Sequence, residues 1–330
     1  MKKLFIGILV SIVFVYFSFR GVEFDKVLTS FKNSKYFFLI PAIVLFLLAS
    51  LLRSLRWEVI LFPLVKISQK RLFPIFCVGQ MGATLFPMRI GEFVRAYLVN
   101  VESKIPISTA LATTLMEKLF DLLTILSILF FITFNSTLPG WLVKIGYVSM
   151  PAFAVLLFLV LCLNFRPEFA IKLSGPFLRI FPKELQLRLE NIIHRFADGF
   201  KIISSPKRLF YILVLSFSIW GCFGLGIYSL FFFSNFQLTM FDALIVLVCT
   251  ILGISIPAAP GMVGNFHYAS IVALLILNVP KDEALMFSMI FYFLVIGRNI
   301  LLGLIYMPWV NLSFKDVRKR FDLWRKLDHS

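Results

Sequence analysis

The sequence predicts an all-α integral membrane protein with about six full transmembrane helices and two broken helical hairpins inserted from opposite faces. The first observation is composition: 60% of the 330 residues are hydrophobic, 40 are phenylalanine, and the mean hydropathy is +0.92. Soluble domains are not this apolar, whereas multi-pass membrane proteins are. The second observation is a pair of breaks rich in proline and glycine within apolar runs, and the third is the distribution of basic residues among the loops.

Six apolar runs with charged borders are predicted to cross the membrane completely. They cover residues 4–19, 36–55, 107–134, 142–163, 209–233 and 284–308. The first run resembles a secretory signal, but no small-x-small cleavage site precedes Arg20, so we expect an uncleaved span. Spans and hairpins together are expected to form one transmembrane domain, residues 1–310, followed by a basic cytoplasmic tail, residues 311–330.

The first predicted hairpin, residues 72–101, is organised around a break from Pro87 to Gly91. The apolar segment before it, residues 74–86, has 13 residues and would form a helix about 20 Å long, whereas the hydrocarbon core is about 30 Å thick. A helix broken at membrane depth is tolerated where its freed backbone groups face protein or a wet cavity. We therefore expect this break to face one of the two.

The second predicted hairpin, residues 240–278, repeats the pattern near the other end of the chain. When Pro87 is aligned with Pro260, Gly91 falls on Gly264, and both segments follow P-x3-G-[EN]-F-x2-A. Paired segments broken by proline and glycine point to the binding site of a transporter. The residues expected to make the two breaks are Pro87, Gly91, Pro257, Pro260, Gly261 and Gly264.

The basic residues predict that both termini are cytoplasmic. With the N-terminus inside, 23 of the 33 lysines and arginines lie on cytoplasmic segments and six on external ones, in agreement with the positive-inside rule. The first hairpin then enters from the cytoplasm and the second from outside, as an inverted repeat whose tips meet near the midplane. Eight ordinary spans, two of them short, are the alternative. The net charge of +16 is explained by orientation and anionic lipid head groups, and no nucleic acid is expected as a partner.

Residues 165–208 are expected to include an amphipathic helix on the inner leaflet. Apolar residues from Leu185 to Ile203 recur at helical spacing, with lysine and arginine on other faces. The tail, residues 311–330, has the same character. A face that anchors to lipid is one explanation for both segments, and a docking site for a partner is the other.

Three charged residues surround the first break: Arg89, Glu92 and Arg95. If Gly91 opens the second half-helix, its free N–H groups and the two arginines would form a site for a phosphate or carboxylate head group. The alternative is that Glu92 and Arg95, at i and i+3, neutralise each other as a structural pair. Charges are costly at membrane depth, which favours a functional role.

A second charged group lies within the predicted span 107–134. Glu117 and Asp121 share a helix face at i and i+4, and Lys118 is three residues before Asp121. A buried carboxylate pair can exchange protons or ions, as proton-coupled carriers do. Alternatively, these residues pair with buried arginines and hold the core together.

Two further candidates lie in the second half of the chain. Arg298, in the middle of the last span, is expected to pair with the carboxylate of Glu92, Glu117 or Asp121, a structural role that is compatible with a substrate contact. His267 and Tyr268 follow the second break. For His267 a hydrogen-bonded packing role is weighed against a role as ligand or base.

The sequence contains no established enzyme signature. HExxH, GxSxG, Walker loops and Cys/His metal spacings are absent, so we expect no metal and no cofactor. Glu23 and Asp25, in the first external loop, keep open an enzyme that acts on a lipid-linked sugar.

Five ordered segments carry a resemblance to a known family. They are LRSLRW (52–57), FPMRIGEFVRA (86–96), MEKLFD (116–121), PAAPGMVG (257–264) and GR (297–298). Together they resemble the lysylphosphatidylglycerol synthase transmembrane-region family, also called flippase-like, over essentially the whole chain. The resemblance implies lipid handling, because in some members such a domain moves aminoacylated phosphatidylglycerol to the outer leaflet. Aminoacyl transfer belongs to a separate soluble domain that we do not expect here. Many members carry glutamate where this chain has His267, which weighs against an acidic role there.

These observations lead to one expected function and two alternatives. We expect a flippase that moves an anionic or aminoacylated phospholipid, or a lipid-linked head group, between the leaflets of a bacterial or archaeal inner membrane. The expected head-group site is Arg89, Glu92, Arg95, Glu117, Asp121 and Arg298, with Arg53, Arg56, Trp57, Lys118, Asn265, His267 and Tyr268 as secondary candidates. Membrane lipids are the expected partners, and a second copy of the chain and a separate lipid-modifying enzyme are left open. The alternatives are a membrane enzyme or accessory protein of lipid-linked sugar or glycolipid biosynthesis, and a non-transporting scaffold.

Overall fold

The computed structural model of the protein describes residues 2–86, 91–133, 140–165, 205–256 and 259–310. All regular secondary structure in these residues is helical, which confirms the predicted all-α class. The α-helices are α1 (Lys2–Phe19), α2 (Phe24–Lys32), α3 (Leu39–Leu61), α4 (Gln69–Leu85), α5 (Gly91–Ser103), α6 (Ile107–Thr133), α7 (Gly140–Phe165), α10 (Pro206–Phe233), α11 (Met240–Ser255), α12 (Val263–Ile276), α13 (Lys281–Tyr292) and α14 (Arg298–Tyr306). The short turns are η1 (Tyr36–Phe38), η3 (Pro260–Met262) and η5 (Met307–Trp309), which are 3-10 helical, and η4 (Phe293–Gly297), which is π-helical.

Within the described residues, three segments are long and apolar enough to cross a membrane. They are Tyr36–Leu61, Pro206–Phe233 and Lys281–Trp309, and each contains one of the predicted full spans. The predicted spans 107–134 and 142–163 fall on α6 and α7, which have 27 and 26 residues. The helices and their apolar composition define a multi-pass membrane protein.

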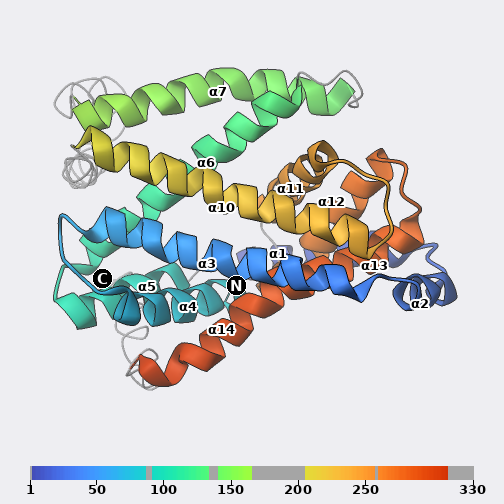
Figure 1. The fold of residues 1–330 in the computed structure, drawn as a ribbon, viewed down its shortest axis with the longest axis horizontal. Coiled ribbons are helices and arrows are strands. Elements are labelled where there is room, and N and C mark those ends of the chain that lie inside the picture. The colour runs from blue at the N-terminus through green and yellow to red at the C-terminus, as the bar shows by residue number, and fades with distance from the viewer. Residues whose placement is uncertain (1, 87–90, 134–139, 166–204, 257–258, 311–330) are drawn as a thin grey trace.

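α3 and α10 form the centre of the bundle, where they pack along each other. Figure 1 shows both helices running along the long axis of the molecule. The pair α4 and α5 lies beside one half of this centre, and the pair α11 and α12 lies beside the other half (Figure 1). The two predicted hairpins therefore lie against different halves of the central pair of helices.

The first hairpin is held by very close approach of α4 and α5. A Cβ atom added to Gly91 would lie 1.8 Å from the nitrogen of Ala83 and 2.2 Å from the carbonyl carbon of Gly82. A Cβ added to Gly79 would lie 2.7 Å from the Cβ of Arg95. Small residues allow such contact between helices in membranes. Gly91 therefore lets the backbones touch, and Gly79 leaves room for the Arg95 side chain.

The second hairpin, formed by α11, η3 and α12, is closed by polar contacts to its backbone. The Nδ2 of Asn265 donates to the carbonyl oxygens of Ile256 (2.9 Å) and Gly253 (3.3 Å), and the hydroxyl of Tyr292 donates to that of Gly261 (2.8 Å). Gly261 has a φ of 77°, in the left-handed region that glycine tolerates best. The turn η3 also contacts α4, so the broken part of one hairpin touches a helix of the other.

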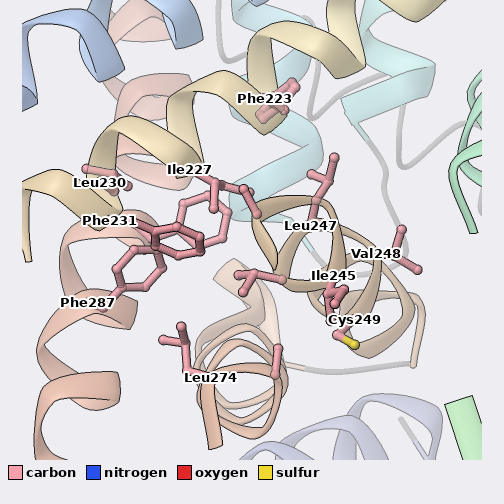
Figure 2. Close-up of a cluster of buried hydrophobic side chains, with 14 of the residues drawn as sticks. Phe223, Ile227, Leu230, Phe231, Ile245, Leu247, Val248, Cys249, Leu274 and Phe287 are labelled. Atoms are coloured by element: carbon pink, nitrogen blue, oxygen red, sulfur yellow. The ribbon is translucent and has the colours of Figure 1, made fainter. Parts of the chain in front are cut away.

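The larger of the apolar core clusters surrounds the second hairpin, and a smaller one packs on α4 and α5. Figure 2 shows buried side chains from α10, α11, α12 and α13 meeting there, with the rings of Phe231 and Phe287 next to each other. Their centroids are 5.6 Å apart. The buried ion pairs lie instead beside the first hairpin, so the surroundings of the two hairpins differ chemically.

α3 is longer than predicted, since it continues past the expected end at Leu55 to Leu61. Arg56, which follows the predicted end of this span, lies within the helix and is 1% exposed. The helix can continue past Leu55 because Arg56 has a counter-charge inside the bundle, which Asp121 on α6 supplies from far along the chain.

Several predicted features lie outside the described residues. They are Pro87, Arg89, Pro257, residues 166–204 of the amphipathic segment, and the tail 311–330.

Candidate functional site

Three ion pairs connect α6 to its neighbours α3 and α5. They are Arg95–Glu117 (Nη2–Oε2, 2.7 Å), Arg56–Asp121 (Nη1–Oδ1, 2.9 Å) and Lys118–Glu92 (Nζ–Oε1, 3.1 Å). Both members of the Arg95–Glu117 pair are buried, Arg56 is buried while Asp121 is 17% exposed, and the Lys118–Glu92 pair is partly exposed. Glu117 and Asp121 do share one face of α6, as their spacing predicts.

Each of the five charged residues at the first break and on α6 that the structure describes therefore pairs across helices. The proposed pairing of Glu92 with Arg95 within α5 is replaced by two contacts to α6, Glu92 to Lys118 and Arg95 to Glu117. The structure shows the alternative arrangement, in which the α6 carboxylates Glu117 and Asp121 pair with Arg95 and Arg56. Removing one partner from such a buried pair leaves an uncompensated charge, at a cost of about 3–5 kcal/mol.

Arg95 is enclosed by aromatic rings as well as by Glu117. Its guanidinium carbon lies 3.5 Å from the centroid of the Trp57 ring and 4.9 Å from that of Phe76. Trp57 is fixed in turn because its Nε1 donates to the Oγ1 of Thr113 at 3.1 Å. The Nη2 of Arg95 contacts Glu117 as an ion without a well-aligned hydrogen bond. Charge and ring stacking together hold this guanidinium.

Asp121 receives two donors from different helices. Besides Arg56 from α3, the Nε1 of Trp220 on α10 donates to its Oδ1 at 3.2 Å. The Nη1 of Arg56 also donates to the Oγ of Ser216 at 2.9 Å. Ser216, Trp220 and Phe223 are spaced i, i+4 and i+7 on α10, so one face of that helix lines the site. Sequence analysis missed these residues, and this spacing within an otherwise apolar helix is the signal that identifies them.

Arg53 and Arg298 differ from the paired arginines. Neither has a carboxylate within ion-pair distance among the residues that the structure describes. The guanidinium carbon of Arg53 lies 5.2 Å from the ring centroids of both Trp220 and Phe223. That of Arg298 lies 5.7 Å from Phe223, and its two Nη atoms donate to the carbonyl oxygen of Phe46 and to the Oδ1 of Asn299 (2.9 Å). The two arginines therefore flank one phenylalanine ring.

The prediction that Arg298 pairs with an acidic residue is wrong among the residues that the structure describes. Glu92, Glu117 and Asp121 pair instead with Lys118, Arg95 and Arg56. The π-helical turn η4 ends directly before Arg298 and sets the direction of its side chain. Asn299 then reaches α4, with its Nδ2 3.5 Å from the Oγ1 of Thr84. This places the start of α14 near the end of α4, where the first break begins.

The candidates of the second hairpin occupy packed positions. The Nδ1 of His267 and the Oγ of Ser288 are hydrogen-bonded at 2.9 Å, and the His267 ring lies 4.9 Å from that of Tyr292. Tyr268 stacks on Phe14 with 4.8 Å between centroids. The side-chain amide of Asn265 donates to the backbone carbonyl oxygens of Gly253 and Ile256, as described above. The contacts of His267 correspond to the packing role that was weighed for it. The structure thus brings the charged candidates of the first half together with Arg298, while Asn265, His267 and Tyr268 lie outside this cluster.

In the part of the chain that the structure describes, no three His, Cys, Asp or Glu side chains are arranged to hold a metal ion. The two buried carboxylates of α6 are each occupied by arginine. What the cluster can do chemically is to bind an anion at its arginines.

The fold and this site define a class: multi-pass helical membrane proteins with a charged cluster buried beside a broken hairpin. The chain belongs to the family described as Lysylphosphatidylglycerol synthase TM region, which residues 4–303 match. It is similar to the UPF0104 membrane protein MJ1078 of Methanocaldococcus jannaschii, 26% identical over 64% of this chain and 88% of the relative. It is also similar to a UPF0104 membrane protein of Methanothermobacter thermautotrophicus, 24% identical over 69% and 72% of the two chains.

A third similarity is local. A stretch of 48 residues is 44% identical to the Glycosyltransferase AglD of Haloferax volcanii, covering 14% of this chain and 8% of that protein. No solved structure matches the chain.

Proposed function

We propose that this protein binds the head group of a membrane lipid in the charged cluster beside the first hairpin and moves that lipid between the leaflets. The observation that carries the proposal is the cluster itself. Ionisable groups within membrane segments are costly and mark pathways for polar cargo. Here they converge from α3, α5, α6 and α14 next to a helix that breaks at Gly91.

The two hairpins supply the geometry that the proposal needs. Transporters with inverted repeats bind their cargo where two discontinuous helices meet. We take α4–α5 to enter from the cytoplasm and α11–α12 from outside, with both termini in the cytoplasm. The contact between η3 and α4 supports a meeting of the two breaks inside the bundle.

The test is exchange of fluorescent lipids between the leaflets of liposomes that contain the purified full-length chain. Glu92 and Glu23 form a matched pair of targets, because each carboxylate contacts one lysine. Glu92 lies 3.1 Å from Lys118 in the cluster, and Glu23, exposed directly before α2, lies 2.9 Å from Lys26. We expect Glu92→Gln to slow exchange about tenfold, equal to about 1.4 kcal/mol in the barrier, and Glu23→Gln to leave it unchanged. Well-folded protein that exchanges neither phosphatidylglycerol, lysyl-phosphatidylglycerol nor a polyprenyl phosphate would contradict the proposal.

A second candidate function is a role in glycolipid biosynthesis, which the local similarity to a glycosyltransferase favours. Such an enzyme needs an acidic residue at a membrane face, and Asp25 on α2 is exposed. Asp25→Asn should then abolish sugar transfer while Glu92→Gln only weakens it. A larger loss of lipid exchange in Glu92→Gln than in Asp25→Asn would support the transporter.

A further inference from the structure

The charged cluster beside the first hairpin carries more positive than negative charge. Its described members are five cations, Arg53, Arg56, Arg95, Lys118 and Arg298, and three carboxylates, Glu92, Glu117 and Asp121. Glu58, the acidic residue of α3, lies near the end of that helix, where it accepts a hydrogen bond from Gln69 at 2.7 Å. Among the described residues the cluster therefore has a surplus of two positive charges.

The surplus is located on Arg53 and Arg298. The other three cations each have a carboxylate partner, while these two contact aromatic rings, a carbonyl oxygen and an amide oxygen. Both guanidinium groups face the Phe223 ring, and their like charges repel each other. The Nε atoms of both are buried without a hydrogen-bond partner. The Nε atoms of Arg56 and Arg95 are too, but these side chains each form a direct ion pair with a carboxylate, whereas Asp121 and Glu117 attract Arg53 only from beyond ion-pair distance.

We propose that the cargo of this site is a lipid whose head group ends in a phosphate monoester, bound between Arg53 and Arg298. This inference rests on the proposed function, because it assigns the chemistry of the same site. A phosphate monoester carries about −1.5 to −2 charges at pH 7, which matches the surplus. A phosphodiester such as phosphatidylglycerol carries half of that, and a lysyl-phosphatidylglycerol head group is cationic and would add to the surplus.

The geometry of arginine suits this ligand. The guanidinium fork donates in a plane to two phosphate oxygens, and it keeps its charge when buried. An anion between Arg53 and Arg298 would accept from their free N–H groups and remove the repulsion between them. Asn299 on α14 lies beside Arg298, and its Nδ2 group offers a further donor.

The experiment measures binding of defined lipids to the full-length protein in phosphatidylcholine nanodiscs. Dioleoyl phosphatidic acid and farnesyl phosphate provide the monoester on two kinds of tail. Phosphatidylglycerol provides the diester, and lysyl-phosphatidylglycerol the cationic head group. Tryptophan fluorescence is the readout, because Trp220 lies against Arg53. We expect both monoesters to bind at least about tenfold more tightly than either other lipid, equal to about 1.4 kcal/mol.

Variants locate the site. Arg53→Gln and Arg298→Gln should each weaken binding of the monoester about tenfold, and the double variant should lose the preference over phosphatidylglycerol. Arg71→Gln is the matched control, because Arg71 is exposed at the start of α4, and it should bind like the wild type. If Arg298→Gln does not fold, as judged by size-exclusion chromatography, Arg53→Gln and Arg298→Lys carry the test.

The outcomes separate this inference from the proposed function. Equal affinity for phosphatidylglycerol or lysyl-phosphatidylglycerol, or an unchanged preference in the double variant, would overturn the inference. If such a lipid is also exchanged between leaflets, the proposed function stands without it. Tight binding of a monoester without leaflet exchange would instead support the ligand assignment and remove the transport function.

Discussion

The guanidinium group of Arg95 joins the Trp57 ring and the carboxylate of Glu117. Its carbon lies 3.5 Å from the ring centroid, and its Nη2 lies 2.7 Å from Oε2 of Glu117. These three residues belong to α5, α3 and α6, so a single side chain connects three helices. Because Arg95 and Glu117 are both buried, neither charge can be solvated when the other is lost.

Removing either member of this pair should destabilise the protein strongly. We expect Arg95→Met and Glu117→Gln each to lower the free energy of unfolding by about 3–5 kcal/mol, since a buried charge is left alone. Thermal unfolding in detergent, followed by tryptophan fluorescence, measures the effect. The double variant should be more stable than the sum of the single variants predicts. Strict additivity would show that the two charges do not interact.

The Arg298→Met variant should behave in the opposite way. Arg298 has no carboxylate partner among the described residues, so its loss removes a buried charge without creating another. We expect an unfolding temperature equal to or above that of the wild type, measured in the same assay as Arg95→Met. A loss as large as that of Arg95→Met would mean that Arg298 is compensated by a negative group and would weaken the argument for a charge surplus.

The close packing of the first hairpin gives a third prediction. In Gly91→Ala the new methyl group would lie 1.8 Å from the backbone of α4, so the two helices must separate. Overpacking of this kind costs about 1–3 kcal/mol. The control is Gly221→Ala on α10, where no atom lies within 4 Å of the added Cβ. We expect the control to unfold at or slightly above the temperature of the wild type, because alanine favours helix over glycine.

The orientation of the hairpins can be tested by labelling cysteines from one side of the membrane. Glu102, near the end of α5, and Gln237, between α10 and α11, are both exposed and flank different hairpins. In a background without the four native cysteines, Glu102→Cys should react with an impermeant maleimide only from the cytoplasm, and Gln237→Cys only from outside. Reaction of both from the same side would exclude insertion of the hairpins from opposite faces.

Much of the fold follows from patterns that a single helix or loop contains. Apolar length places α3, α10 and the segment α13–α14, and the breaks at Gly91 and Gly261 follow from proline and glycine within apolar runs. The common face of Glu117 and Asp121 follows from helix geometry. These are local properties, so one sequence is sufficient to predict them.

The partners of the buried charges could not be predicted in this way. Arg56 reaches Asp121 across 65 positions of sequence, and the choice depends on how α3 crosses α6. The sequence pattern ended the predicted span at residue 55, before Arg56, and it paired Arg298 with a carboxylate because a charge at membrane depth is costly. Pairing is decided by packing between helices, which composition and spacing do not encode.

The π-helical turn η4 lies directly before Arg298 and interrupts the regular α-helical register between Phe293 and Gly297. Each residue of an α-helix turns the chain by about 100°, and a π-turn accommodates one extra residue without interrupting the helix. In regular α-helix an extra residue would rotate every later side chain by that angle, and the wider turn absorbs this rotation. Arg298 therefore stays beside Phe223 and Phe46, and Gly303 stays against Met81. The length of this segment can thus differ by one residue while the charged side chain that follows it keeps its neighbours.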